Sequence, residues 1–370
     1  MITEIDLRYM ALALSDAKKG LGRTSPNPCV GAVVVKHDRV IGRGYHRKAG
    51  TPHAEIHALA AAGAESGGAT LYVTLEPCSH TGRTPPCCEA VARSGIARVV
   101  VGMEDPNPLV QGRGIRYLLD RGINVTSGVL EEQCRDLNRP FIKHISTGLP
   151  WVVMKAGISL DGRITYDGRK TGWMTGVETS AVVHRLRNRY DAILVGAGTV
   201  LVDDPALTTR LPGRRPGRDA HRCIVGSTLS IPEQAKVLTW ESTARTLIFC
   251  NADADTAKSA RLEQRGIGVH RVACDAGGGL DLRQVLRQLG GQGITSLLVE
   301  GGAKIHGSML NHCLYDYAHL FYAPVFAGES GIPLQSGYRS SGRDTAHRLA
   351  EVQYRRCGED MMVSGKFMYR

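Results

Sequence analysis

Short apolar strand segments alternate with helical segments in two successive runs, and this alternation constrains the fold more than any other feature of the chain. In the first run, the helix-like stretch AEIHALAAAGA lies between the strand-like segments CVGAVVVKHDRVIGRGYH and ATLYVTL. A second run begins with the strand-like segment WVVMKAGIS at Trp151. Strands that alternate with helices build layered α/β domains. We therefore expect an α/β fold in both runs.

The chain length predicts two domains. A chain of 370 residues exceeds what one hydrophobic core usually organises. The segment STGLP separates the two runs, with Thr147 and Pro150 as its limits for this purpose. We expect a first domain over residues 1–147 and a second over 150–370. The Gly-, Pro- and Arg-rich segment at 210–219 reads as an exposed loop within the second domain.

Charge and composition bear on the partners and the compartment. The net charge is +11, which favours anionic partners such as a phosphorylated small molecule. Aromatic residues make up only 5%, which leaves little material for stacking nucleic-acid bases, so we expect no nucleic-acid partner. No apolar run approaches the ~20 residues that cross a bilayer, and we expect no membrane partner. Ten irregularly spaced cysteines without an N-terminal apolar targeting segment favour the cytoplasm.

The motifs PHAEIHA and TLEPCSHTGRTPPCC bring metal-ligand residue types together. A catalytic zinc ion takes three nitrogen or sulfur ligands and keeps one water, and His53, Cys78 and Cys87 can supply those three. Glu55 lies two residues after His53, where it can move protons without being a ligand. This division of roles is that of zinc deaminases, in which the metal activates water and a glutamate transfers protons.

The cysteine spacing and the neighbouring prolines of this constellation lead to two further expectations. The usual cysteine spacing is Cys-x-x-Cys, whereas eight residues separate Cys78 from Cys87, so Cys88 is an alternative third ligand. Prolines precede both His53 and Cys78, which predicts that these two residues lie at helix N-termini, where the helix dipole favours a thiolate.

The second run contains two glycine-rich turns after predicted strands. They occur in AILVGAGTVLVDDPALTTR and in SLLVEGGAKIHGSML. Glycines between a strand and a helix let backbone N–H groups contact a phosphate, although tight turns explain such glycines equally well. Neither turn is a complete G-x-G-x-x-G, so a Rossmann domain is not favoured.

Several longer motifs carry a family resemblance through nearly the whole chain. The strings SPNPCVGAVVV, HAEIHAL, YVTLEPCSHTGRTPPCC and DPNPLVQGRGI resemble the deaminase half of the bifunctional riboflavin-biosynthesis deaminases/reductases. The strings KAGISLDGR, GWMT, GAGTVLVDDPALTTR and VEGGAKIHGSML resemble the reductase half. The wide cysteine spacing is that family's own pattern. The resemblance implies an N-terminal cytidine-deaminase-like three-layer domain and a C-terminal dihydrofolate-reductase-like domain.

The resemblance also implies site residues in the deaminase half. It assigns Zn²⁺ to His53, Cys78 and Cys87, with Glu55 as the catalytic residue. Substrate contacts are implied for Asn27, His46, Arg83, Asp105 and Asn107. From chemistry alone, Asn27 and Asn107 read equally well as turn residues beside prolines. Arg83 suits the ribose phosphate, although family members also carry lysine there.

For the reductase half, the resemblance implies NADPH as cofactor. NADPH contacts are implied for Gly157, Trp173, Thr199, Asp203, Ser227, Gly302, Ala303, Lys304, Ile305, His306, Gly307 and Ser308. Substrate contacts are implied for Thr171, Arg187, Leu207, Arg210 and Glu300. Arg187 and Arg210 suit a phosphate by charge and fork geometry, but either equally suits a surface ion pair. Lys155 and Asp203 are candidates for polarising or protonating the opened sugar, and Asp161 and Gly162 for shaping a turn.

The resulting hypothesis is a two-step enzyme. It removes the exocyclic amine of a phosphoribosylated diaminopyrimidinone hydrolytically with zinc, and then reduces the ribosyl side chain to ribityl with NADPH. We expect a homo-oligomer. One alternative is a tRNA-editing deaminase, which also has a His-Glu and Cys arrangement. The other is a zinc-stabilised binding module, in which a fourth protein ligand replaces the water.

Overall fold

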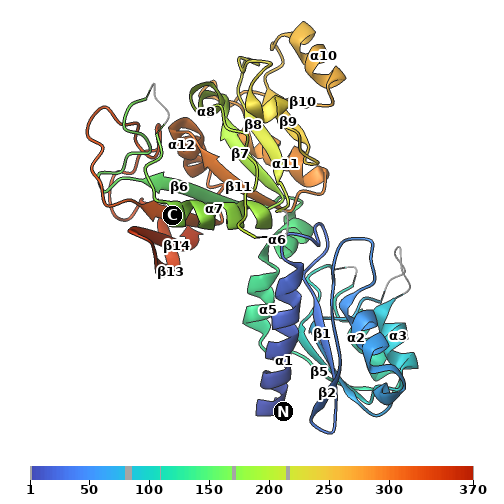
Figure 1. Cartoon of the computed structure of the whole chain (residues 1–370). Helices are drawn as coiled ribbons and strands as arrows, with labels where there is room; N and C mark the ends of the chain where they lie inside the picture. Colours follow the sequence, from blue (N-terminus) through green and yellow to red (C-terminus); the bar gives the residue numbers. More distant parts are fainter. Residues whose placement is uncertain (1, 80–85, 109, 169–171, 214–216, 370) are drawn as a thin grey trace. The chain divides into compact units, whose positions relative to one another are not determined.

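The computed structural model describes residues 2–79, 86–108, 110–168, 172–213 and 217–369. The chain forms two compact units, Met1–Gly148 and Leu149–Arg370. The division falls inside the segment 147–150 that separates the two runs in the sequence. The elements of both units are labelled in Figure 1.

The first unit is built on a five-stranded sheet with the order β2-β1-β3-β4-β5. Strand β1 is antiparallel to both of its neighbours, whereas β3, β4 and β5 are parallel. The strands are β1 Gly31–Lys36, β2 Arg39–Tyr45, β3 Thr70–Leu75, β4 Arg98–Met103 and β5 Asn124–Thr126. The helices are α1 Glu4–Ala17, α2 Ala54–Ala62, α3 Cys87–Arg93, α4 Arg113–Leu119, α5 Glu131–Leu137 and α6 Arg139–Thr147, with 3₁₀ turns at Lys18–Gly20 and Gly63–Ser66.

Helices cover both faces of this sheet, which makes a three-layer unit. Helices α1 and α5 lie on one side and α2 and α3 on the other (Figure 1). Two glycines permit the close approach of the helices. A Cβ on Gly31 would lie 2.0 Å from the Ala13 carbonyl oxygen of α1, and a Cβ on Gly42 would lie 2.1 Å from the Ala58 carbonyl oxygen of α2.

Local features of the sequence explain several elements of this unit, but two of its helices were not predicted. A turn at His37 and Asp38 joins β1 and β2, and both residues have positive φ, 49° and 56°. Helices α5 and α6 have no counterpart among the sequence predictions. In the segment 124–130, only Asn124–Thr126 forms a strand. Gly128 with φ 86° and Leu130 with φ 54° turn the chain out of the extended conformation before α5 begins.

The second unit is built on a nine-stranded sheet with the order β10-β9-β8-β7-β11-β6-β12-β14-β13. Its strands are parallel from β10 to β12, and β14 and β13 add an antiparallel hairpin. The strands are β6 Trp151–Ile158, β7 Ala192–Gly196, β8 His221–Val225, β9 Thr246–Cys250, β10 Gly268–Arg271, β11 Ser296–Gly301, β12 Tyr317–Tyr322, β13 Arg348–Cys357 and β14 Asp360–Met368. The helices are α7 Val177–Arg189, α8 Ala197–Asp203, α9 Lys236–Thr239, α10 Thr256–Gln264, α11 Leu282–Gly291 and α12 Ala303–Asn311.

Successive side chains of the central strands enter cores on opposite faces of this sheet. Leu297 and Val299 of β11 pack with residues of α11 and α12, whereas Leu298 packs with residues of α7. In β7, Leu194 belongs to the α11 and α12 side, and Ile193 packs with residues of α8, α9 and α10. Strands buried on both faces read as the continuous apolar runs seen in the sequence.

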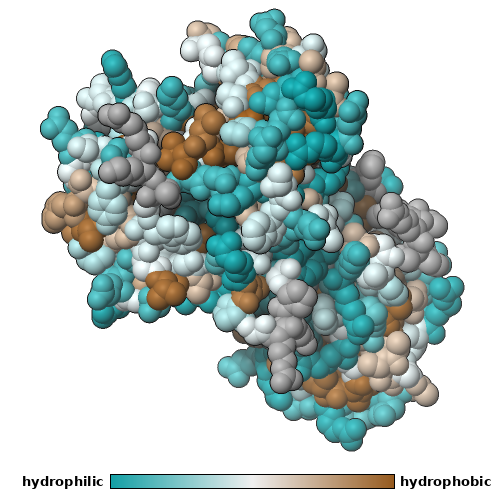
Figure 2. All heavy atoms as spheres, turned by 45° about the horizontal axis from the view of Figure 1, so that its top comes forward, coloured by the Kyte–Doolittle hydropathy of each residue, from teal (hydrophilic) through white to brown (hydrophobic). Residues whose placement is uncertain are grey.

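The hydrophobic residues on one face of the molecule and the character of its helices bear on membrane contact. On the face drawn in Figure 2, hydrophobic residues occur in small groups among hydrophilic ones. Within the described ranges, none of the helices combines the length and the apolar character that crossing a bilayer requires.

The close packing of α1 on β1 generates a stability prediction. Gly31→Ala places a methyl group against the α1 backbone, so we expect the free energy of unfolding of the first unit to fall by about 1–3 kcal/mol. Gly67→Ala is the matched control, because a Cβ there has nothing within 4 Å. Urea titration of the two variants and the unchanged protein measures the difference. Equal stability of both variants would contradict this account of the packing.

Candidate active sites

A cavity of about 470 Å³ in the first unit collects most of the predicted deaminase residues. Several elements end at it: the N-terminus of α2 carries His53 and Glu55, and the chain after β3 carries Cys78. The loop after β4 carries Asp105 and Asn107. The predicted residues that line the cavity are Asn27, His46, His53, Glu55, Cys78, Asp105 and Asn107.

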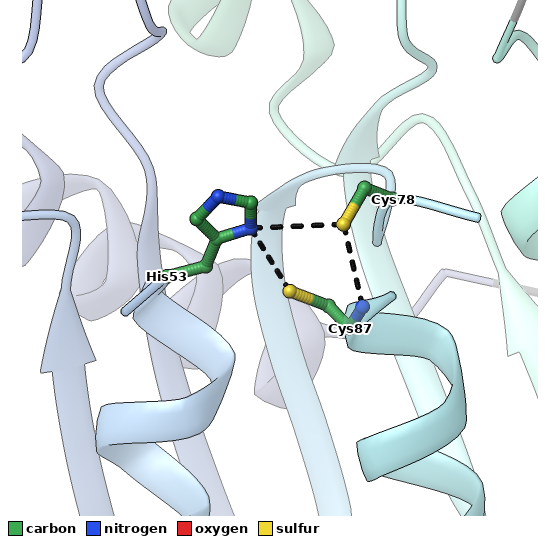
Figure 3. Close-up of side chains that lie close together, drawn as sticks. All are labelled: His53, Cys78 and Cys87. Carbon is green, nitrogen blue, oxygen red and sulfur yellow. Dashed lines mark hydrogen bonds between the residues drawn. The ribbon is translucent and has the colours of Figure 1, made fainter. Parts of the chain in front are cut away.

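Three metal-ligand side chains point toward one another beside this cavity (Figure 3). His53 Nδ1 lies 3.0 Å from Cys87 Sγ and 3.6 Å from Cys78 Sγ. The backbone N–H of Cys87 donates to Cys78 Sγ at 3.3 Å. The three ligand atoms all lie within 4.8 Å of one another, which suits a single ion.

The structure distinguishes Cys87 from its neighbour Cys88. Cys87 is the first residue of α3 and its sulfur faces His53. Cys88 packs instead in the hydrophobic core of the unit, so its sulfur is not among the three ligand atoms that face one another.

The predicted helix N-termini are right for one ligand and wrong for another. His53 is the N-cap residue of α2, as the preceding Pro52 suggests. Cys78 lies in the loop after β3, and the cysteine that opens a helix is Cys87. Pro77 follows a strand here and ends its extended course, so a proline before a ligand does not by itself mark a helix start.

The electrostatics of the group favour an anionic sulfur and a protonatable carboxyl. The hydrogen bond from Cys87 and the neighbouring His53 lower the pKa of Cys78 below its ordinary value despite burial, whereas the hydrogen bond to Cys78 and burial raise the pKa of Cys87. Burial raises the pKa of Glu55 to about 7. Glu55 Oε2 is buried, and no residue in the described part of the chain forms a hydrogen bond with it. A carboxyl in such a state can both accept and donate a proton near neutral pH.

The predicted substrate residues of this unit fall into two groups. Asn27 and His46 form a pair, with Asn27 Nδ2 at 3.2 Å from His46 Nε2. Asp105 Oδ1 accepts the backbone N–H of Asn107 at 2.8 Å. Arg83 lies outside the described residues.

The residues that line this cavity without having been predicted include Glu76, Phe141 and Ile145. Glu76 stands in the quoted motif TLEPC, so its position between a strand and a ligand was a usable signal. Phe141 and Ile145 come from α6, which was not predicted, and their spacing of four residues places them on one helix face.

A second cavity, of about 370 Å³, lies within the second unit. Residues at the carboxyl ends of β6, β7 and β11 line it, where open α/β sheets usually bind ligands. The predicted residues that line it are Lys155, Gly157, Trp173, Arg187, Thr199, Asp203, Leu207, Arg210, Glu300, Gly302, Ala303 and His306.

The remaining predicted residues of the second unit do not border this cavity or are not described. Ser227 follows β8, and its carbonyl accepts the Asn251 N–H. Lys304 is exposed on α12, and Gly307 is buried against the Ser336 backbone. Ile305 and Ser308 also lie on α12 but do not line the cavity, because successive residues of a helix point to different sides. Thr171 lies outside the described residues.

An ion pair occupies one wall of the second cavity. Arg187 Nε and Nη2 each donate to a Glu300 carboxylate oxygen at 2.7 Å, and Arg187 Nη1 donates to the Thr208 carbonyl. Lys155 Nζ lies 3.9 Å from Glu300 Oε2. Burial opposes the Glu300 charge, but Arg187 and Lys155 lower the pKa of Glu300 to about 2. The Arg187 fork is therefore engaged with a carboxylate, in a buried pair and not a surface one.

The expected turn at Asp161 is also present. The Asp161 carboxylate accepts the Ser159 hydroxyl and the backbone N–H groups of Ala327 and Gly328. Gly162 has φ 77°, a conformation that glycine adopts readily.

Comparison with protein families matches each unit to a different description. Residues 3–103 match the family "Cytidine and deoxycytidylate deaminase zinc-binding region". Residues 150–363 match the family "RibD C-terminal domain". The chain belongs to the RibD family.

Relatives along the whole chain agree. The riboflavin biosynthesis protein RibD of Bacillus amyloliquefaciens is 42% identical over 357 residues, which are 96% of this chain and 95% of the relative. The protein of the same name from Aquifex aeolicus is 42% identical over 363 residues, covering 98% of this chain and 99% of the relative. This RibD family member is thus a bifunctional deaminase/reductase of riboflavin biosynthesis.

Solved RibD structures share the fold. Acinetobacter baumannii RibD is 34% identical with a TM-score of 0.88, and 99% of each chain is covered. The diaminohydroxyphosphoribosylaminopyrimidine deaminase/5-amino-6-(5-phosphoribosylamino)uracil reductase of Thermotoga maritima is 36% identical with a TM-score of 0.85, again with 99% of each chain covered. The predicted fold class, a cytidine-deaminase-like domain followed by a reductase domain, is confirmed.

Buried His184 beside the second cavity generates a pH prediction. Its Nδ1 accepts the Arg210 N–H at 3.2 Å, and burial together with the charges of Arg187 and Arg210 lowers its pKa from 6.5 to about 4. The unfolded chain therefore binds the proton first as pH falls. We expect His184 to add no pH dependence to the unfolding free energy of the second unit above pH 6.5, and to lower that free energy by about 1.4 kcal/mol per pH unit toward pH 4. This loss adds to those from other histidines of the unit, such as His306 and His319, whose pKa values burial also lowers.

The variant His184→Asn isolates this contribution, because asparagine offers a similarly placed acceptor but does not titrate. Urea titrations at pH 7, 6 and 5 should show a shallower loss for the variant. Parallel losses in the two proteins would show that His184 is not the group responsible.

Proposed function

We propose that the first unit hydrolytically deaminates a phosphoribosylated diaminopyrimidinone with zinc, and that the second unit then reduces the ribosyl side chain to ribityl with NADPH. The observation that carries the proposal is the convergence of His53, Cys78 and Cys87 beside Glu55 in one cavity. The name of the Thermotoga maritima relative supports this substrate class.

The donor set fits zinc by its chemistry. One imidazole nitrogen and two sulfurs are ligands that Zn²⁺ prefers, and three protein ligands leave a fourth position for water, as in catalytic sites. Bound there, zinc would act as a Lewis acid that makes water a nucleophile at neutral pH. His53 and Cys78 both border the cavity, so these residues would hold the ion beside the substrate.

Glu55 is suited to carry the protons of deamination. Addition of water to the ring carbon and loss of ammonia require one proton to leave the water and one to reach the departing amine. The buried Glu55 Oε2 can hold that proton between the two steps, since the Glu55 pKa is raised to about 7. Asn27, His46, Asp105 and Asn107 supply polar groups that can orient the pyrimidine.

In the second unit, NADPH would supply the hydride for reduction of the opened sugar. Opening of the ribosylamine ring leaves a C=N bond at C1, which accepts the hydride at carbon, and Lys155 is the group that we assign to donate the accompanying proton to the nitrogen. Burial lowers its pKa from the ordinary value, which makes proton release easier, and Glu300 lies 3.9 Å away to hold the ammonium in place. Asp203, at the end of α8, borders the same cavity and stays the second candidate for this role.

The contacts of these residues limit the phosphate assignment. Because Arg187 is paired with Glu300, Arg210 is the better candidate for the substrate phosphate in this cavity. In the described part of the chain, Arg210 Nη1 donates to the Thr208 hydroxyl at 3.2 Å, and no ion pair engages this guanidinium. Arg83, Thr171, the homo-oligomer and the cytoplasmic location stay predictions.

The two functions are tested together by supplying the purified protein with the diaminopyrimidine phosphate, first without and then with NADPH. We expect ammonia release without NADPH, and loss of NADPH absorbance only when the deaminated product is present. Absorbance loss in the absence of deamination, or no ammonia release by metal-loaded protein, would contradict the order of steps proposed.

Glu55→Gln separates the two sites. The amide cannot exchange protons, so we expect ammonia release to fall by about 10²–10⁴-fold. Reduction of independently prepared deaminated substrate should be unchanged. Glu65→Gln, which alters an exposed carboxylate just beyond α2, is the matched control and should leave both rates unchanged. Retention of ammonia release in Glu55→Gln would remove Glu55 from the proton path.

A further inference from the structure

Glu76 is a buried carboxylate for which the deamination chemistry above has no use. Glu76 follows β3 directly and lies two positions before Cys78, and only 3% of its surface is exposed. A buried carboxylate is costly unless its oxygens accept hydrogen bonds. Its partners therefore indicate what it is for.

Within the described residues, the Glu76 carboxylate accepts four hydrogen bonds, all from backbone N–H groups of one segment. Oε2 accepts from Asp105 at 3.2 Å and from Gly112 at 3.0 Å. Oε1 accepts from Gly114 at 2.8 Å and from Ile115 at 3.2 Å. The carboxylate thus ties the beginning of the loop after β4 to the first turn of α4.

This segment carries the polar residues that face the deaminase cavity. Asp105 is bound directly through its N–H, and its own carboxylate accepts the Asn107 N–H. The backbone carbonyl of Asn107 in turn accepts the backbone N–H groups of Val110 and Gln111 at 2.8 and 2.9 Å. A chain of hydrogen bonds therefore runs from Glu76 to both Asp105 and Asn107.

The same residue is fixed to the metal-ligand side of the cavity. The Glu76 N–H donates to the Met103 carbonyl at 3.0 Å, which continues the pairing of β3 with β4. The backbone of α4 also approaches the strand end closely, since a Cβ on Gly114 would lie 2.0 Å from the Pro77 carbonyl oxygen. Cys78 follows directly, so one short segment connects the sulfur with the carboxylate.

We propose that Glu76 is a positioning residue for deamination, which holds Asp105 and Asn107 at a fixed place relative to Cys78. The inference rests on the proposed function of this cavity. It assigns Glu76 no contact with the reacting atoms. Its effect reaches the substrate through the two polar residues on the loop.

Glu76→Gln tests the proposal, because the amide keeps the size of the side chain but turns one acceptor oxygen into a donor that faces two N–H groups. We expect KM for the diaminopyrimidine phosphate to rise by about tenfold or more, with a smaller change in kcat. Bound zinc should stay at the level of the unchanged protein, and reduction of the deaminated substrate should be unaffected. An unchanged KM, or a loss of activity that follows loss of zinc, would overturn the proposal.

A double-variant comparison with Asn107→Ala provides a readout that a general structural role would not move. If Glu76 acts through the loop, Glu76→Gln and Asn107→Ala together should raise KM by clearly less than the product of their separate effects. Independent, multiplicative effects would contradict the proposal. Should Glu76→Gln fail to fold, Glu76→Asp, which keeps both acceptor oxygens on a shorter side chain, enters the same comparison.

The unchanged protein separates this inference from the function on which it rests. Absence of ammonia release by the unchanged protein would refute the deaminase function itself. Normal ammonia release together with an unaltered Glu76 variant would refute only the positioning role.

Discussion

The approach of one imidazole nitrogen and two sulfurs to within 4.8 Å of one another is the constraint on which the first unit depends. His53 comes from the start of α2, Cys78 from the loop after β3 and Cys87 from the start of α3. The glycines of β2 let α2 pack closely on the sheet, which places His53 beside the other two ligands. The same arrangement buries Glu55 and raises its pKa, so packing and chemistry have one origin.

In the second unit, buried charged side chains fix the wall of the cavity, where the first unit has a set of metal ligands. Glu300 at the end of β11 is held ionised by Arg187, and Lys155 of β6 lies beside it. Both strands are central in the sheet, and their side chains reach the cavity from its carboxyl end. A buried pair of this kind holds its geometry because separating the partners would leave an uncompensated charge.

Much of this organisation could be predicted from the sequence, since it depends on local patterns. The alternation of strands and helices indicated both α/β units, and the His-x-Glu and Cys motifs brought forward the residues that meet in space. The spacing alone left Cys87 and Cys88 open, because which thiol turns inward depends on where α3 begins. Phe141, Ile145 and the role of Glu76 were missed for the same kind of reason. Their positions depend on an unpredicted helix and on backbone partners about 30–40 residues away.

The most direct test of the central claim is X-ray absorption at the zinc edge of deamination-active protein. The account predicts one zinc ion per chain, with two sulfurs at about 2.3 Å and two nitrogen or oxygen atoms at about 2.0–2.1 Å. One of the lighter ligands should be an exchangeable water. A shell of four protein ligands without water, or full deaminase activity in protein without metal, would contradict the account.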